Sequence, residues 1–140
     1  MVYVDTSALV PMFVREPGSE AILGWIESSG EALAISDWSL VEFASALAIK
    51  ARMGHAGEAF AKRAMEQVQA FAAASCLVAT PRAEEFRRAA ELCAEASANL
   101  RAGDALHLSI AEALKVDGLL CLDEAMCAQA RALHLDVIAL

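Results

Sequence analysis

The chain has 140 residues, which is enough for one domain of ordinary size and too few for two independent cores. Apolar residue types make up 58% of the sequence and charged types 21%, a composition that excludes a disordered tail. The net charge of −8 at pH 7 would repel a polyanionic partner if it were spread evenly over the surface. We therefore expect one well-packed domain over residues 1–140.

The positive charges are concentrated in the middle of the chain. Residues 50–101 contain eight of the eleven lysines and arginines, whereas the segments on either side are strongly acidic. Two interpretations stay open: a face that contacts phosphate groups, or ordinary solvated helix faces.

Short apolar segments alternate with helical patterns along the sequence. The apolar segments predict strands at 2–4, 32–35, 77–79, 118–122 and 136–138. Apolar spacing and capping residues predict a short helix after Thr6 and Ser7, and further helices at about 19–29, 37–54, 57–72, 84–98, 102–116 and 124–133. Strands that alternate with helices predict an α/β domain whose parallel sheet is covered on both faces.

The sequence shows no sign of membrane insertion or export. Its longest apolar run, 70–79, is interrupted by Ser75 and is far shorter than the ~20 residues of a membrane span. The first residues contain neither a basic leader nor a cleavage site, and the four cysteines form no metal-binding motif. We expect a cytoplasmic protein with reduced, mostly buried thiols.

Four acidic residues stand where their charge needs a partner. Asp5 and Asp123 directly follow predicted strands, and ligands bind outside the carboxyl ends of parallel strands. Asp104 lies in the first turn of a predicted helix, and Glu42 shares a helix face with apolar residues. Taken singly, each acid has an ordinary explanation: a helix cap for Asp5, a helix-dipole partner for Asp104, the start of a turn for Asp123, or a solvent-directed side chain for Glu42.

Together, the four acids predict a metal site. We expect them to converge without a cation among them, which is what a hard divalent ion requires of its oxygen ligands. Like charges in one crevice should also raise the pKa of at least one of these carboxyl groups.

Four segments, in this order and spacing, resemble the PIN-domain ribonucleases, and in particular the VapC-type toxins of bacterial toxin–antitoxin pairs. They are VYVDTSAL at 2–9, SLVEFASAL at 39–47, GDALHL at 103–108 and LDE at 122–124. The resemblance implies a three-layer α/β/α fold with a five-stranded parallel sheet, order 3-2-1-4-5, and about seven helices. It also implies a magnesium-dependent endoribonuclease, with manganese as the alternative ion.

The resemblance assigns roles to individual residues. Asp5 and Asp104 would ligate the metal directly, and Glu42 and Asp123 would ligate it directly or through water. Glu124 lies beside Asp123 and is an alternative to it as the fourth acid. By the same resemblance, Thr6 orients ligands or water. Two further residues have expected roles from their position beside Asp104: Arg101 reaches a substrate phosphate or lies on the surface, and His107 packs or donates a hydrogen bond.

The partners implied by the resemblance are an RNA substrate, a small cognate antitoxin and a second copy of the chain. The antitoxin would lie in a groove between the helices at 19–29 and 37–72, with Met12, Phe13, Trp25, Trp38 and Phe60 as anchors or, alternatively, as ordinary core residues.

Two other functions are considered. One is a PIN-like RNA- or protein-binding module whose acidic site has lost catalysis. The other rests on residues 5–7, which resemble the phosphoaspartate motif of haloacid dehalogenase-like phosphatases. These enzymes need a second aspartate where this chain has Ser7.

Overall fold

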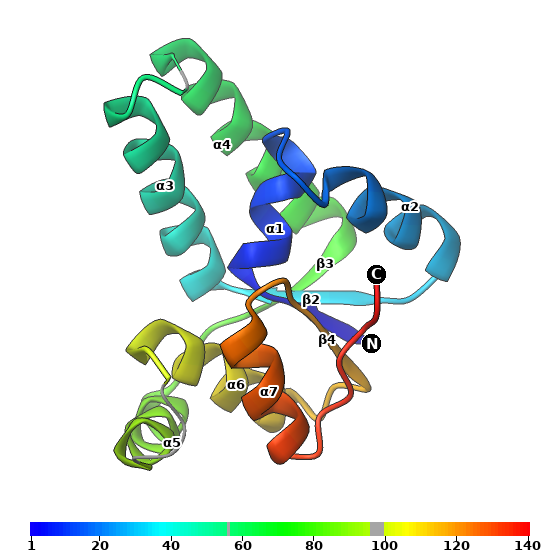
Figure 1. The fold of residues 1–140 in the computed structure, drawn as a ribbon, viewed down its shortest axis with the longest axis vertical. Helices are drawn as coiled ribbons and strands as arrows, with labels where there is room; N and C mark the ends of the chain where they lie inside the picture. The colour runs from blue at the N-terminus through cyan, green and yellow to red at the C-terminus, as the bar shows by residue number, and fades with distance from the viewer. Residues whose placement is uncertain (56, 96–99) are drawn as a thin grey trace.

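The computed structural model of the protein describes residues 1–55, 57–95 and 100–140. These residues form a four-stranded parallel sheet with helices on both faces (Figure 1). The strands are β1 (Val2–Val4), β2 (Leu33–Ser36), β3 (Cys76–Ala79) and β4 (Gly118–Leu120). The helices are α1 (Thr6–Phe13), α2 (Ser19–Ser29), α3 (Asp37–Arg52), α4 (Glu58–Ser75), α5 (Ala83–Ala94), α6 (Ala102–Leu114) and α7 (Glu124–Ala132).

The sheet has the order β3-β2-β1-β4, and every neighbouring pair is parallel. Val2 in the central strand β1 pairs with Leu33 on one side and with Gly118 on the other. The expected α/β architecture and the order of the first four strands are therefore confirmed.

The expected fifth strand is reduced to a single bridge. Val137 pairs in parallel with Leu119 of β4, and the hydrogen bond from the Ile138 N–H to the Leu119 carbonyl measures 2.9 Å. The segment lies beside β4, as order 3-2-1-4-5 requires, but β4 itself ends at Leu120 and not at 122. A three-residue strand leaves few backbone groups for a longer ladder.

The helices begin and end within three residues of the predicted positions, except the helix predicted at 84–98; α4, for example, runs three residues past its predicted end at 72. The helix predicted at 84–98 ends at Ala94, and the predicted residues 96–98 lie outside the described part of the chain. The helix predicted to reach 116 ends at Leu114, because Lys115 adopts the left-handed conformation with φ 51° and closes it.

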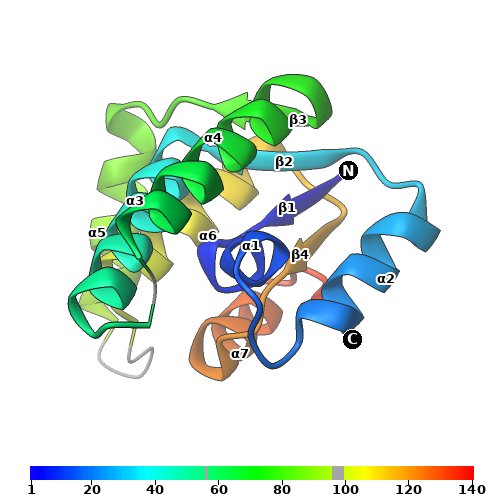
Figure 2. The same ribbon diagram turned by 90° about the horizontal axis from the view of Figure 1, so that it is seen from above.

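Each face of the sheet has its own apolar cluster. Helices α1–α4 cover one face and α5–α7 the other (Figure 1), and Figure 2 shows α3 and α4 side by side over the sheet. Successive strand residues point to opposite faces, so Val2 and Val4 enter the cluster under α1–α4 while Tyr3 enters the cluster under α5–α7. Phe43 and Leu108 are fully buried members of the two clusters.

The expected groove anchors are packed against these clusters. Met12, Phe13, Trp25 and Phe60 are half-buried against the α1–α4 cluster, and Trp38 packs against the other one. An antitoxin groove at these residues stays a prediction.

Membrane-spanning helices and disulfide bonds are both absent from the described residues. None of the helices in the described ranges is long and apolar enough to span a membrane. All four cysteines are free; Cys121 and Cys127 are buried, Cys76 is half-buried and Cys93 is exposed.

Candidate active site

The four acids line one cavity of about 390 Å³ at the carboxyl end of the sheet. They come from different elements: Asp5 precedes α1, Glu42 lies on α3, Asp104 on α6, and Asp123 between β4 and α7. The three further predicted residues, Thr6, Arg101 and His107, line the same cavity. The fold therefore brings together all seven residues singled out from the sequence.

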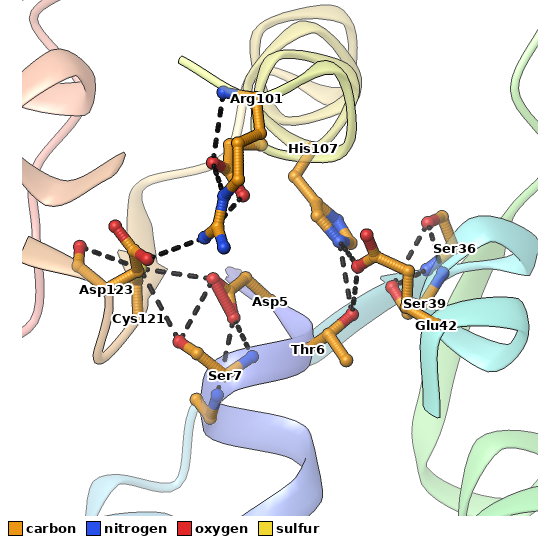
Figure 3. Close-up of polar contacts among 12 residues, drawn as sticks. Asp5, Thr6, Ser7, Ser36, Ser39, Glu42, Arg101, His107, Cys121 and Asp123 are labelled. Carbon is orange, nitrogen blue, oxygen red and sulfur yellow. Dashed lines mark hydrogen bonds and ion pairs between the residues drawn. The ribbon is translucent and has the colours of Figure 1, made fainter. Parts of the chain in front are cut away.

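Asp5 is buried and caps helix α1. One carboxylate oxygen accepts hydrogen bonds from the backbone N–H groups of Ser7 and Ala8, and the other accepts from the Ser7 hydroxyl and the Cys121 thiol, both at 3.1 Å (Figure 3). Of the two caps that the sequence offers for this helix, the structure therefore shows Asp5 and corrects Thr6 and Ser7. A carboxylate offers about four acceptor positions, and donors of this chain use four.

Glu42 forms a compact group with Thr6 and His107. Its Oε2 accepts from the Thr6 hydroxyl at 2.7 Å and lies 2.7 Å from His107 Nε2 (Figure 3). Because a carboxylate can only accept, Nε2 carries the proton of that bond. His107 is only 2% exposed and thus holds Glu42 from within the protein.

A buried network extends from His107 away from the cavity. Its Nδ1 lies 2.8 Å from the Tyr3 hydroxyl, which donates to the Ser36 hydroxyl at 2.9 Å. Ser36 and Ser39 also exchange hydrogen bonds at the start of α3, the helix that carries Glu42. The network therefore joins β1, β2, α3 and α6 behind the site and fixes the orientation of Glu42.

Arg101 lies among the acids on the other side of the cavity. Its Nε donates to Asp104 Oδ2 at 2.9 Å, and its Nη2 donates to Asp123 Oδ2 at 2.8 Å. The expectation that the acids meet without a cation is wrong. Arg101 stands three residues before Asp104, one helical turn away, and its guanidinium reaches both carboxylates.

The geometry shows which of the two adjacent acids, Asp123 or Glu124, belongs to the cavity. Asp123 lines the cavity, accepts from the Met126 N–H at 2.9 Å and caps α7. Glu124 is exposed in the first turn of that helix and is absent from the cavity lining. Asp123 is therefore the fourth acid of the cavity.

The pKa values of two carboxyl groups are shifted in opposite directions. Burial raises the pKa of Asp5, against the hydrogen bonds it accepts. Burial also disfavours ionisation of Glu42, but the hydrogen bonds from His107 and Thr6 outweigh it and lower the pKa of Glu42. The expected raised pKa is thus present at Asp5, with burial rather than repulsion between acids as its main cause.

The residue types fit a hard divalent cation, although their present spacing does not form a complete site. Within the described ranges, no three His, Cys, Asp or Glu side chains lie close enough to one another to hold a metal ion. Asp104 and Asp123 nevertheless both contact the guanidinium of Arg101, so their carboxylates face a common space. Oxygen donors of this kind suit magnesium or manganese.

Sequence reasoning missed several residues that shape the site. Gly103 faces Glu42, and a Cβ at this position would collide with Glu42 Oε1. Ser7 and Cys121 hold Asp5, while Tyr3 and the two serines of the buried network hold His107. Gly103 directly precedes Asp104 and Ser7 lies two residues after Asp5, so the sequence itself places both near a predicted acid. The roles of Tyr3 and Cys121 depend on tertiary contacts.

Comparisons with known proteins identify the family. The model of the PIN domain family matches residues 2–136, and the chain belongs to this family. No curated protein matches the sequence.

Several solved structures share the fold. The Mycobacterium tuberculosis toxin VapC20, described as cleaving the sarcin–ricin loop, has a TM-score of 0.74 at 16% identity, with 92% of this chain and 95% of that chain covered. PAE2754 from Pyrobaculum aerophilum has a TM-score of 0.67 at 25% identity, with 97% and 81% covered. VapBC2 from Rickettsia felis, bound to a promoter DNA fragment, has a TM-score of 0.68 at 17% identity, with 99% and 98% covered.

Proposed function

We propose that the protein is a divalent-metal-dependent endoribonuclease, the toxin of a toxin–antitoxin pair. The observation that carries this proposal is the cavity at the carboxyl end of the sheet, which four acids from separate elements line. Membership of the PIN domain family and the similarity to VapC20 support the reaction class and an RNA substrate.

Each residue of the cavity has a separate role in the proposed reaction. Asp5 and Asp104 would ligate magnesium or manganese directly, and Asp123 directly or through water. When bound, such an ion neutralises charge on a phosphoryl oxygen and supplies a hydroxide-like nucleophile at neutral pH. Glu42 has a lowered pKa and is ionised at neutral pH, so it can accept a proton from the attacking water. His107 and Thr6 hold Glu42 in place through Oε2, which leaves Oε1 for the cavity.

The proposed partners follow from the same relatives. The similarity to VapBC2 supports a cognate antitoxin as the partner of this chain. A homodimer and a cytoplasmic location remain part of the proposal by resemblance to VapC-type toxins.

Cleavage of total RNA by purified protein tests the proposed activity. The wild-type chain should cut RNA with millimolar magnesium and stop cutting when a chelator is added. Asp104→Asn removes one negative charge from a metal ligand at almost constant volume, so cleavage should fall by at least ~100-fold. Cleavage that is unaffected by both the chelator and Asp104→Asn would refute the metal-dependent mechanism.

One observation favours the second candidate, a PIN-like binding module without catalysis. Arg101 already neutralises part of the charge of Asp104 and Asp123, and Asp5 is fully engaged by protein donors. If this module is the correct function, the wild-type chain should bind RNA or a partner protein without cutting RNA at any magnesium concentration.

A further inference from the structure

We propose that Arg101 is a displaceable cation of the acidic site. Its guanidinium competes with the metal for Asp104 and Asp123, and once displaced it contacts the RNA phosphate. This inference rests on the proposed nuclease function, since it concerns the same cavity.

The contacts of Arg101 use the oxygens that a metal would need. Its Nε and Nη2 engage Oδ2 of Asp104 and Oδ2 of Asp123, and Nη2 also lies 3.4 Å from Asp104 Oδ1. The guanidinium thus spans the gap between α6 and the segment after β4 (Figure 3). A metal ion bound through these same atoms excludes the arginine from them.

The exposure of the three side chains shows why the arginine can leave. The side chain of Arg101 is 75% exposed, whereas those of Asp104 and Asp123 are 16% and 28% exposed. The acids are thus largely enclosed and the cation enters from solvent. An ion pair with one partner in solvent contributes little net free energy, because the exposed guanidinium is well hydrated when it leaves.

The displaced guanidinium would remain beside the reaction site. Its backbone directly precedes α6, and its side chain lines the same cavity as all four acids. Arginine binds phosphate through two parallel N–H groups and keeps its charge at any physiological pH.

Replacing Arg101 by a neutral residue should therefore change metal binding and RNA binding in opposite directions. Arg101→Gln removes the competing cation, so Mn²⁺ should bind about three- to tenfold more tightly. The same change removes the phosphate contact, so the KM for RNA should rise. A residue that only stabilises the fold would not produce these opposed changes.

The test combines calorimetric titration with Mn²⁺ and steady-state cleavage of RNA. The matched control is Arg15→Gln, which removes an exposed arginine that pairs with Glu20 and is absent from the cavity lining. The control should retain the wild-type affinity for Mn²⁺ and the wild-type KM.

The possible results are distinct. Tighter Mn²⁺ binding and a higher KM for Arg101→Gln alone would support the proposal. Equal Mn²⁺ affinity of wild type and Arg101→Gln would overturn the competition while leaving metal-dependent cleavage intact. Tighter binding with an unchanged KM would overturn the phosphate contact. If neither protein binds Mn²⁺, both this inference and the proposed function are refuted.

Discussion

The two sides of the cavity are built differently. Glu42 is held by His107, which is buried and linked through Tyr3 to the sheet. Asp104 and Asp123 are held by Arg101, which approaches from solvent. Buried, fully paired networks are rigid, whereas an exposed ion pair opens at little cost. The difference suggests one side that keeps its geometry and another that rearranges when a metal or substrate arrives.

The largest expected effect concerns the exposed side. Asp123→Asn should lower RNA cleavage by about 100-fold, because it removes the charge of a proposed metal ligand. Glu124→Gln is the matched control: the neighbouring acid is exposed, and cleavage should stay within about twofold of wild type. Steady-state cleavage assays of the two variants provide the measurement. Equal losses in both variants would contradict the assignment of Asp123.

The second prediction compares stability on the two sides. His107→Ala removes one hydrogen-bond partner each from the buried Tyr3 hydroxyl and from Glu42, and should lower the free energy of unfolding by about 2 kcal/mol. Arg101→Gln removes only an exposed ion pair and should cost less than about 1 kcal/mol. Urea denaturation of metal-free protein measures both values. A larger loss for Arg101→Gln would reverse the comparison.

The smallest expected effect concerns Gly103, which faces Glu42 on the buried side of the cavity. Gly103→Ala places a methyl group against Glu42 Oε1, so the carboxylate must move and cleavage should fall by about tenfold, the equivalent of about 1.4 kcal/mol. Gly24→Ala is the control, because nothing lies within 4 Å of its added Cβ in the middle of α2. It should leave cleavage unchanged and stabilise the fold by about 0.5–1 kcal/mol. Rate assays and denaturation curves test the pair, and a rate unchanged in Gly103→Ala would show that Glu42 tolerates displacement.

Most of the fold follows from local sequence patterns. The short apolar segment at 2–4 predicts β1, and the spacing of Phe43 and Leu47 predicts α3, because both patterns bury one continuous apolar surface. The fifth strand was overestimated, since the apolar residues at 136–138 do not reveal how short the neighbouring β4 is.

The sequence predicts the acids of the site but not the contacts that hold them in place. Acids at strand ends and on an apolar helix face are visible in the sequence, so Asp5 and Glu42 were identified. The pairing of Arg101 with Asp123 joins residues 22 positions apart, and the Tyr3–His107 contact joins residues 104 positions apart. Such contacts depend on how α6 packs against the sheet, which no local pattern specifies.

The most direct test of the account is a crystal structure of the protein soaked with Mn²⁺, with the metal located by its anomalous scattering. We expect one Mn²⁺ ion at about 2 Å from carboxylate oxygens of Asp104 and Asp123, with Arg101 turned away from both. An anomalous map without a metal in the cavity, with Arg101 still bridging the two acids at millimolar Mn²⁺, would contradict the central claim that these acids form a metal-dependent nuclease site.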